Sequence, residues 1–337
     1  MVWAVVLLEL CQCFISAIFI DLPLSLASLF YRRQKSVANS VVLVTGAARG
    51  IGLATARRLA LSHGARIVLV DRDQAGNEAA AAELRGAGAE AWAFTADVAD
   101  AEQMRSLAAR LKALPKLGNV DLLICNAGVL VTKDLSDVAD DEIRRTISIN
   151  LLGAFWSIRA FLGDMMERRS GHIVVVASMA AWGGIRGSPD YCASKFAVRG
   201  LMESLEEELM EKGLADCIKT STVYPYFVST PMIAHCDIQQ KIGAVLTAEE
   251  AAGGLVEGVL AEERHIWVPS YAWFPCYLKW CLPLRVNGDV RVASAGSLGC
   301  FRALWSTRHW GPGEVEVDGT DVLARNRLSL PPSRILS

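Results

Sequence analysis

The chain has 337 residues, of which 52% are hydrophobic and 21% charged, and its formal net charge is −2. This length suits one large domain, or one domain with appendages. The near-neutral charge excludes the basic footprint of nucleic-acid-binding proteins. The nine cysteines show no C-x-x-C pair and no metal-ligand spacing. We therefore expect reduced thiols facing the cytosol, no disulfide framework and no metal site.

Residues 2–30 are almost continuously apolar, and the basic stretch RRQK follows them. A cleaved signal peptide usually carries its positive charge before the apolar run and a small-residue cleavage site after it. Because the charge comes afterwards here, residues 1–35 are predicted to be an uncleaved membrane anchor with a cytosolic basic flank. Asp21 and Pro23 interrupt the run, so a spanning helix and a monotopic hairpin both remain open. A buried core helix is the alternative to an anchor.

Residues 41–52, VVLVTGAARGIG, join an apolar run to a glycine-rich turn, and a helical stretch follows. Small residues let the backbone approach a pyrophosphate, which binds at a helix N-terminus because the helix dipole favours anions there. The candidate cofactor contacts in this turn are Gly46, Arg49, Gly50, Ile51 and Gly52.

A second predicted strand, ARIVLV, ends at Asp71, about 20 residues after the glycine turn. A carboxylate at this place can accept both hydroxyls of the adenosine ribose and repels a 2′-phosphate. Asp71 therefore favours NAD as the cofactor. Arg49 and Arg72 can each meet a phosphate, so NADP stays as the less favoured alternative.

The third and fourth predicted strands also end in candidate cofactor contacts. AEAWAFTADV ends the third strand at Asp97, with Val98 next. Asp97 can reach the adenine amine, or it can cap the helix after it. VDLLICNAG ends the fourth strand in small residues that allow cofactor contact, and its asparagine can tie neighbouring backbone together. These residues are Asn126, Ala127 and Gly128.

Residues 137–169 carry helical periodicity, with Ile143, Ile147 and Asn150 on one face. An asparagine on the inward face of a helix costs stability unless it is hydrogen-bonded. Asn150 is therefore either a satisfied core residue or a group that holds a water molecule in line with Lys195.

The fifth predicted strand, HIVVVAS, ends at Ser178, where open α/β sheets bind ligands. Tyr191 and Lys195 follow four residues apart, on one face of a helix. A free tyrosine titrates near pH ~10, and a nearby ammonium favours its phenolate, so we predict that Lys195 lowers the pKa of Tyr191. Such a phenol can take a proton from an alcohol near neutral pH. The alternative is a helix with a Tyr-x-x-x-Lys pattern and no function.

The sixth strand, IKTSTVYP, ends at Pro225, and Val228 and Thr230 after it are further candidate cofactor contacts. Thr247 and Glu250 have the spacing of a capping box before the next helix. HIWVP is the seventh predicted strand. Strands that alternate with helices predict an α/β fold with a Rossmann-type, doubly wound parallel sheet of about seven strands.

Past this domain, which we place at residues 36–270, the segment 271–286 is rich in aromatic residues and broken by prolines. It is too interrupted to span a bilayer as one helix. It either touches the membrane surface beside the active-site mouth or covers an apolar substrate pocket. Residues 287–337 are predicted to form a flexible tail.

The motifs TGAARGIG and CNAG, followed by Asn150, Ser178 and the Tyr191–Lys195 pair, resemble the short-chain dehydrogenase/reductase family over roughly residues 38–270. The resemblance implies a Rossmann fold with a catalytic tetrad of these four residues. It implies that Tyr191 is the general acid/base and that Lys195 lowers its pKa and binds the nicotinamide ribose. It further implies that Ser178 orients the substrate oxygen and that Asn150 holds the water of a proton relay.

One departure from the family pattern is Tyr226, which stands where the family has glycine after Pro225. Together with the apolar N-terminus and the aromatic segment, it resembles the branch of membrane-anchored retinol dehydrogenases (epidermal retinol dehydrogenase 2 type) and lipid-droplet 17-beta-hydroxysteroid dehydrogenases. That resemblance implies hydride transfer from a hydrophobic alcohol to NAD, with all-trans-retinol first and a 17-beta-hydroxysteroid second. A lipid-droplet scaffold with little turnover and a soluble NADPH-dependent carbonyl reductase are the alternatives.

The same branch implies attachment to the endoplasmic reticulum membrane or lipid droplets, with the catalytic domain facing the cytosol. Members of the family often dimerise through the Tyr–Lys helix and its neighbour, so a homodimer is a further expectation. The expected substrate loop, about 231–246, carries no readable signature.

Overall fold

The computed structural model describes residues 34–233, 245–274 and 276–277. The predicted membrane anchor up to residue 33 and the predicted tail lie outside the described residues. Most of the expected substrate loop and of the aromatic segment lies outside them as well.

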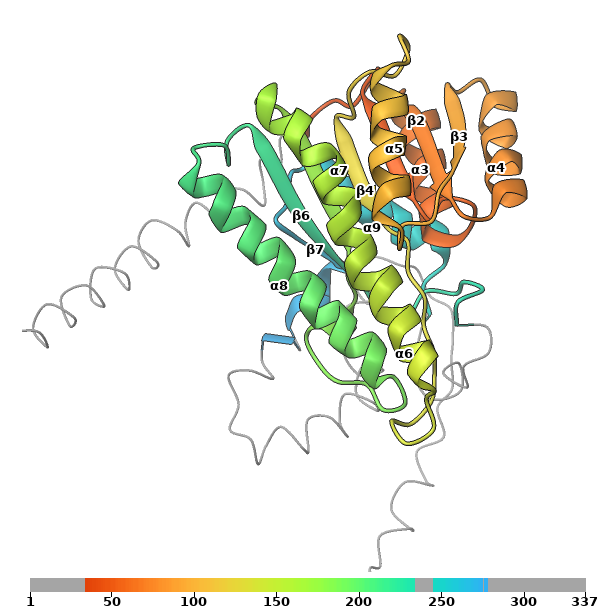
Figure 1. Cartoon of the computed structure of the whole chain (residues 1–337), viewed down its shortest axis with the longest axis vertical. Helices are drawn as coiled ribbons and strands as arrows, with labels where there is room; N and C mark the ends of the chain where they lie inside the picture. The colour runs from red at the N-terminus through yellow and green to blue at the C-terminus, as the bar shows by residue number, and fades with distance from the viewer. Residues whose placement is uncertain (1–33, 234–244, 275, 278–337) are drawn as a thin grey trace, which may run out of the picture.

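Seven parallel strands form one sheet in the order β3-β2-β1-β4-β5-β6-β7 (Figure 1). Their bounds are β1 (Val41–Thr45), β2 (Arg66–Asp71), β3 (Ala91–Thr95), β4 (Leu122–Cys125), β5 (Gly171–Val176), β6 (Ile218–Pro225) and β7 (His265–Val268). All six neighbouring pairs are parallel. The strand order reverses between β1 and β4, where sheets of this kind bind ligands at their carboxyl ends. The predicted Rossmann-like sheet is thus confirmed.

Helices cover both faces of the sheet (Figure 1). Their bounds are α3 (Gly50–His63), α4 (Gln74–Gly86), α5 (Ala101–Lys112), α6 (Asp140–Ile147), α7 (Gly153–Glu167), α8 (Pro189–Glu211) and α9 (Ala248–Leu260). One apolar cluster joins α5, α7 and α8 to one face, and a second joins α3, α4 and α9 to the other. Side chains of β1 alternate between the clusters, with Leu43 in the first and Val44 in the second. Strands covered on both sides need the continuous apolar runs seen in the sequence.

The capping box predicted at the start of α9 is confirmed. Glu250 N donates to Thr247 Oγ1 at 3.1 Å, and Thr247 N donates to the Glu250 carboxylate at 2.8 Å. Both bonds satisfy backbone N–H groups that have no partner within the helix.

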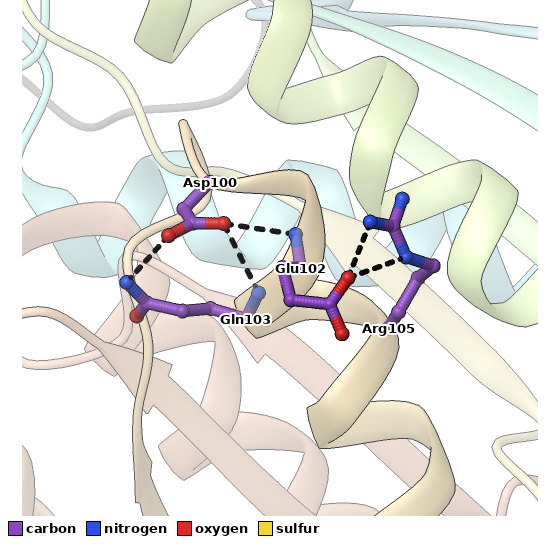
Figure 2. A network of polar contacts seen from close by, with 4 residues as sticks. All are labelled: Asp100, Glu102, Gln103 and Arg105. Atoms are coloured by element: carbon purple, nitrogen blue, oxygen red, sulfur yellow. Dashed lines mark hydrogen bonds and ion pairs between the residues drawn. The ribbon is translucent and has the colours of Figure 1, made fainter.

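The alternative in which Asp97 caps α5 is wrong. Figure 2 shows that Asp100 does so, its Oδ1 accepting hydrogen bonds from the N–H groups of Glu102 at 2.8 Å and Gln103 at 3.2 Å. The Asp97 carboxylate instead accepts a bond from Ala99 N at 2.9 Å. The strand ends two residues before Asp97, and a turn closed by a bond from Asp100 N to Asp97 O separates it from the helix. The cap therefore falls three residues later than expected.

The helical periodicity of residues 137–169 is confirmed for Asp140–Glu167, with one irregular turn in the middle. A π-helical turn, η2 (Ser148–Leu152), joins α6 to α7, and Gly153 N donates to the Ser148 carbonyl five residues earlier. A Cβ on Gly153 would lie 2.8 Å from Val98 Cγ2, so the chain passes close to the tip of β3 here. Single π turns within α-helices often occur at functional sites, and this one holds Asn150.

By length and composition, α6, η2 and α7 together (Asp140–Glu167) could cross a membrane. Their apolar residues pack in the domain core instead, where Ile158, Phe161 and Met165 are buried against the sheet. A core helix of a globular domain passes the same test, so this stretch gives little support for a membrane span.

Lys35 fixes the first described residues to the amino ends of the strands. Its backbone N–H donates to Leu260 O at 2.8 Å, and its Nζ lies 2.6 Å from His172 Nδ1 and 3.6 Å from the Glu262 carboxylate. Burial holds the pKa of His172 well below its ordinary value, so the ring stays neutral and Nδ1 accepts from the ammonium. The chain that follows the predicted anchor thus enters the domain opposite the carboxyl ends of the strands.

Candidate active site

The glycine turn between β1 and α3 requires residues without a side chain. Gly46 and Gly50 have φ values of 65° and 60°, in the left-handed region that favours glycine. A Cβ on Gly52 would lie 2.2 Å from the Gly46 carbonyl oxygen, and one on Gly46 would lie 2.8 Å from Ala127 Cα. The turn, the start of α3 and the tip of β4 therefore meet backbone to backbone. This arrangement fits the pyrophosphate of a dinucleotide, which binds to the N–H groups of such a turn.

Thr45 and Asn126 join the tips of β1 and β4. The Asn126 side-chain amide donates to the Thr45 and Gly46 carbonyls, both at 3.0 Å. The buried Thr45 hydroxyl accepts from Asn126 N at 3.1 Å and from Ala127 N at 3.2 Å. The expected role of Asn126 in tying backbone together is confirmed. Thr45 was not predicted; its signal was a hydroxyl at the last position of an apolar strand.

Asp71 ends β2, and its carboxylate lies between two turns. One oxygen accepts from Ala48 N in the glycine turn at 3.1 Å, and the other accepts from Asp73 N at 3.0 Å. Each oxygen keeps a second lone pair, so the carboxylate can still accept from two hydroxyl groups. Arg49 and Arg72 are exposed beside it.

The remaining predicted cofactor contacts lie at the same edge of the sheet. A Cβ on Gly50 would lie 3.4 Å from Thr230 Cγ2, which places the segment after β6 beside the glycine turn. Ile51 packs against the core cluster of α3, and Val228 pairs with Leu246 in an isolated parallel bridge.

The side chains of Asn150 and Lys195 both lie close to Gly128. A Cβ on this glycine would lie 3.4 Å from Asn150 Oδ1 and 3.7 Å from Lys195 Nζ. The two polar groups come from η2 and α8, which the sequence separates by more than forty residues. The structure therefore gathers these two predicted residues next to the tip of β4.

Lys195 is 4% exposed, and its Nζ donates to the Val176 carbonyl at the end of β5, at 2.8 Å. The same nitrogen lies 5.7 Å from the centre of the Tyr191 ring. Burial lowers the pKa of Lys195 to about 8, because a charged amine loses its hydration there.

The prediction that Lys195 lowers the pKa of Tyr191 is wrong for this structure. Burial raises the pKa of Tyr191 to about 12, and a hydrogen bond with the Ser178 hydroxyl acts in the opposite direction. The ammonium is bonded to a carbonyl and lies over the ring, so it does not compensate for the lost hydration of the phenolate. Ser178 itself caps the short helix η3 (Met179–Ala181), its Oγ accepting from Ala180 N at 3.1 Å.

Asn150 is hydrogen-bonded at both ends of its amide. Its Oδ1 accepts from Val129 N at 2.8 Å, and its Nδ2 donates to Val129 O at 2.9 Å and to Ser194 Oγ at 3.1 Å. The satisfied-core interpretation therefore holds for its side chain. Asn150 and Thr45 also line a small cavity, in which the centre of a water molecule can occupy ≈ 10 Å³. This is room for about one water molecule.

The described rings of the aromatic segment pack partly on the core and are partly exposed. The Tyr277 ring lies 5.1 Å from that of the buried Trp182, which follows η3. Tyr277 nevertheless keeps 43% of its surface exposed, and Tyr271, Trp273 and Phe274 are likewise each more than 40% exposed. The described part of the segment thus covers the core near Ser178 and also presents rings to the outside.

Tyr226 lies where β6 and β7 end. Its N–H donates to Val268 O at 2.7 Å, so the chain continues beside β7 for one residue past Pro225. Pairing of Val176 with Val223 places Ser178 level with Pro225, one residue before Tyr226. The aromatic ring that replaces the family's glycine is therefore half-buried beside the strand tip that carries Ser178.

Residues 40–241 match the family model for short chain dehydrogenase. The chain belongs to this family. It is an NAD(P)-dependent oxidoreductase that acts on CH–OH groups.

The chain is similar to several curated proteins along most of their length. It is 37% identical to estradiol 17-beta-dehydrogenase 11 of Pongo abelii, covering 75% of this chain and 83% of the relative. It is 36% identical to 17-beta-hydroxysteroid dehydrogenase 13 of Homo sapiens, covering 84% and 92%.

Solved structures have the same fold. A short-chain dehydrogenase/reductase from Burkholderia phymatum in complex with NAD matches with a TM-score of 0.65 and 26% identity, covering 73% of this chain and 94% of that one. A putative NAD(P)-dependent gluconate 5-dehydrogenase from Beutenbergia cavernae with bound NADP matches with a TM-score of 0.61 and 30% identity, covering 69% and 96%. Neighbours of this fold thus bind either NAD or NADP.

The glycine turn gives a first testable prediction. We expect Gly52→Ala to weaken NADH binding by about tenfold or more, because the new Cβ meets the Gly46 carbonyl at 2.2 Å and must displace backbone, at a cost of about 1–3 kcal/mol. Gly163→Ala is the matched control, since a Cβ there meets nothing within 4 Å in the middle of α7. Fluorescence titration with NADH measures both variants. Wild-type NADH affinity in Gly52→Ala would contradict pyrophosphate binding by the glycine turn.

Proposed function

We propose that this chain oxidises a hydrophobic secondary alcohol, of the 17-beta-hydroxysteroid class, to its ketone with NAD. The observation that carries the proposal is the meeting of Ser178, Tyr191 and Lys195 at the end of β5. Lys195 also approaches Gly128 at the tip of β4, which meets the glycine turn. The names of the relatives favour this steroid reading over all-trans-retinol, which ranks first from the sequence alone.

NAD, when bound, accepts the hydride from the alcohol carbon. The Tyr191 phenolate takes the hydroxyl proton, and the Ser178 hydroxyl, which already bonds the phenol, holds the substrate oxygen beside it. Lys195 is cationic below about pH 8 and lies close to the ring. An ammonium that turns from the Val176 carbonyl toward the phenol oxygen stabilises the phenolate and makes Tyr191 a stronger acid.

For Asn150 we propose a part in the proton path. Its side chain is committed to Val129 and Ser194, so it fixes the π turn in place. The cavity that it lines has room for about one water molecule. A water held there supports the proton relay that family resemblance implies.

The proposal of a lipophilic substrate is supported by aromatic groups near Ser178. Tyr226 replaces the smallest residue with a flat ring at the adjoining strand tip, and the Tyr277 ring packs on Trp182. A steroid presents a flat apolar face, which aromatic side chains bind well.

A role as a coat or scaffold on a lipid surface, with little turnover, is the second candidate. The exposed rings of Tyr271, Trp273 and Phe274 favour it, since Trp and Tyr gather at membrane interfaces. Turnover by the purified protein separates the two candidates.

The acid–base role predicts a large effect of Tyr191→Phe. We expect NADH formation from estradiol and NAD to fall by about 10²–10⁴-fold, the usual contribution of a general base, while NADH binding is retained. The control is Tyr271→Phe, which removes an exposed phenol from the segment after β7. Wild-type turnover in Tyr191→Phe would contradict the mechanism.

The pH dependence follows from the raised pKa of Tyr191, about 12. Below that value the phenolate fraction grows tenfold with each pH unit, but Lys195, with a pKa of about 8, loses its charge above that pH. We therefore expect kcat/KM for oxidation to rise from pH 7 to about 8 and to level off above it. Ketone reduction uses the protonated phenol and should not rise over this range. Initial rates in both directions test this, and an oxidation profile that falls with pH would count against Tyr191 as the base.

We also propose that Asp71 selects NAD over NADP. Asp71→Ala removes the acceptor of ribose hydroxyls and the charge that repels a 2′-phosphate, so the NAD/NADP ratio of kcat/KM should fall by about tenfold or more. Asp73→Ala is the matched control, because it removes a carboxylate two residues away that caps α4 by accepting from Gly76 N. An unchanged ratio in Asp71→Ala would show that Asp71 does not set the preference.

Membrane or lipid-droplet attachment through the apolar N-terminus is our proposal for localisation. Removal of residues 1–33 keeps Lys35 and its bonds to the domain, and we expect it to move the protein from the membrane pellet to the supernatant. Carbonate washing of the full-length protein separates insertion from charge attraction. A truncated protein that still pellets after washing would contradict the N-terminal segment as the main anchor.

A further inference from the structure

Ser194 connects two residues of the proposed tetrad, although it is not one of them. Its side chain is completely buried between α8 and η2. Its hydroxyl accepts from Asn150 Nδ2 at 3.1 Å and donates to the Tyr191 carbonyl at 2.7 Å. One hydroxyl thus joins the π turn that carries Asn150 to the first turn of the helix that carries Tyr191.

The network continues from Asn150 to the loop after β4. The Asn150 amide accepts from Val129 N and donates to Val129 O. Both hydrogens on its Nδ2 are then used, one by Val129 and one by Ser194. Because Gly128 precedes Val129, the same network reaches the tip of β4, where Lys195 Nζ also approaches.

A serine within a helix often bonds to a carbonyl three or four residues earlier without further consequence. Ser157 in α7 does this, since its buried hydroxyl donates to Gly153 O at 2.7 Å. The Ser157 side chain is also hydrogen-bonded to Cys125 in β4. Ser194 differs because its bond to another segment reaches Asn150 of the proposed tetrad. Removing it leaves a buried N–H of Asn150 without its acceptor and frees the first turn of α8 from η2.

We propose that Ser194 is a positioning residue for the reaction: its hydroxyl holds the Tyr191 turn of α8 at a fixed place relative to Asn150 and the tip of β4. The inference rests on the proposed function, in which Tyr191 transfers the proton. Ser194 touches no reacting atom and acts through Tyr191 and Asn150. A displacement of the phenol by a fraction of an ångström is enough to slow proton transfer, while the glycine turn keeps its contacts.

The test uses the full-length protein, with estradiol and NAD as substrates. We expect Ser194→Ala to lower kcat by about 10- to 100-fold with little change in the KM for NAD. The rising part of the oxidation pH profile should shift to higher pH, because a displaced phenol gains less from the Lys195 ammonium that turns toward it in the proposed mechanism. Ser194→Thr, which keeps the hydroxyl, should recover most of kcat. Ser157→Ala, the matched control, should behave as wild type in all three measurements.

A double-mutant cycle tests the route through Asn150. If Ser194 and Asn150 act through one bond, the loss of log kcat in Ser194→Ala with Asn150→Ala should be smaller than the sum of the two single losses. Additive losses would overturn the proposal, as would wild-type kcat and pH profile in Ser194→Ala.

Hydrogen exchange separates this inference from the proposed function, because it needs no turnover. With NADH present, Ser194→Ala should speed amide exchange in both segments 148–152 and 189–195, and Ser157→Ala should change neither. If the wild type does not oxidise estradiol, the proposed substrate class fails and the exchange result still decides the role of Ser194. Unchanged exchange in both segments of Ser194→Ala overturns it.

Discussion

The contact between the tips of β1 and β4 is the constraint on which the site depends. At this point the strand order reverses, and helices leave toward opposite faces of the sheet. Thr45 and Asn126 close the gap with four hydrogen bonds, and glycine allows the backbones to touch. A larger residue at Gly46 or Gly52 would separate the strand tips, and with them the glycine turn and the segment that carries Gly128.

Burial determines the pKa values of Tyr191 and Lys195 more than their interaction with each other does. Burial favours the neutral forms of both Tyr191 and Lys195, raising the pKa of the phenol and lowering that of the amine. A movement of the Lys195 ammonium toward the phenol oxygen would oppose both shifts, because phenolate and ammonium stabilise each other. The Val176 carbonyl, which now accepts from Lys195, and the Ser178 hydroxyl, which bonds the phenol, lie at the end of one strand. The end of β5 therefore supplies partners for both groups.

The amino and carboxyl ends of the strands carry different features of the molecule. At the amino end, Lys35 reaches the buried His172 and fixes the chain that comes from the apolar N-terminus. At the carboxyl end lie the glycine turn, the proposed tetrad and the exposed rings of Trp273 and Phe274. An N-terminal anchor would thus enter the domain on the side away from the substrate site. The aromatic segment is then the described part best placed to bring that site to a lipid surface.

Local pattern in the sequence was enough for the alternation of strands and helices, the glycine turn, Asp71 at the end of β2 and the capping box at Thr247. Each of these depends on residues close together in the chain, through periodicity, backbone freedom or a single turn of helix. The tertiary structure decided the rest. Asp100 rather than Asp97 caps α5, because the length of a turn is not visible in composition. The π turn at Asn150 and the bonds of Ser194 depend on how η2 packs against α8 and on the close approach of Gly153 to Val98, which follows β3. The direction of the Tyr191 pKa shift depends on burial and on which group receives the Lys195 ammonium, and both are set by segments distant in sequence.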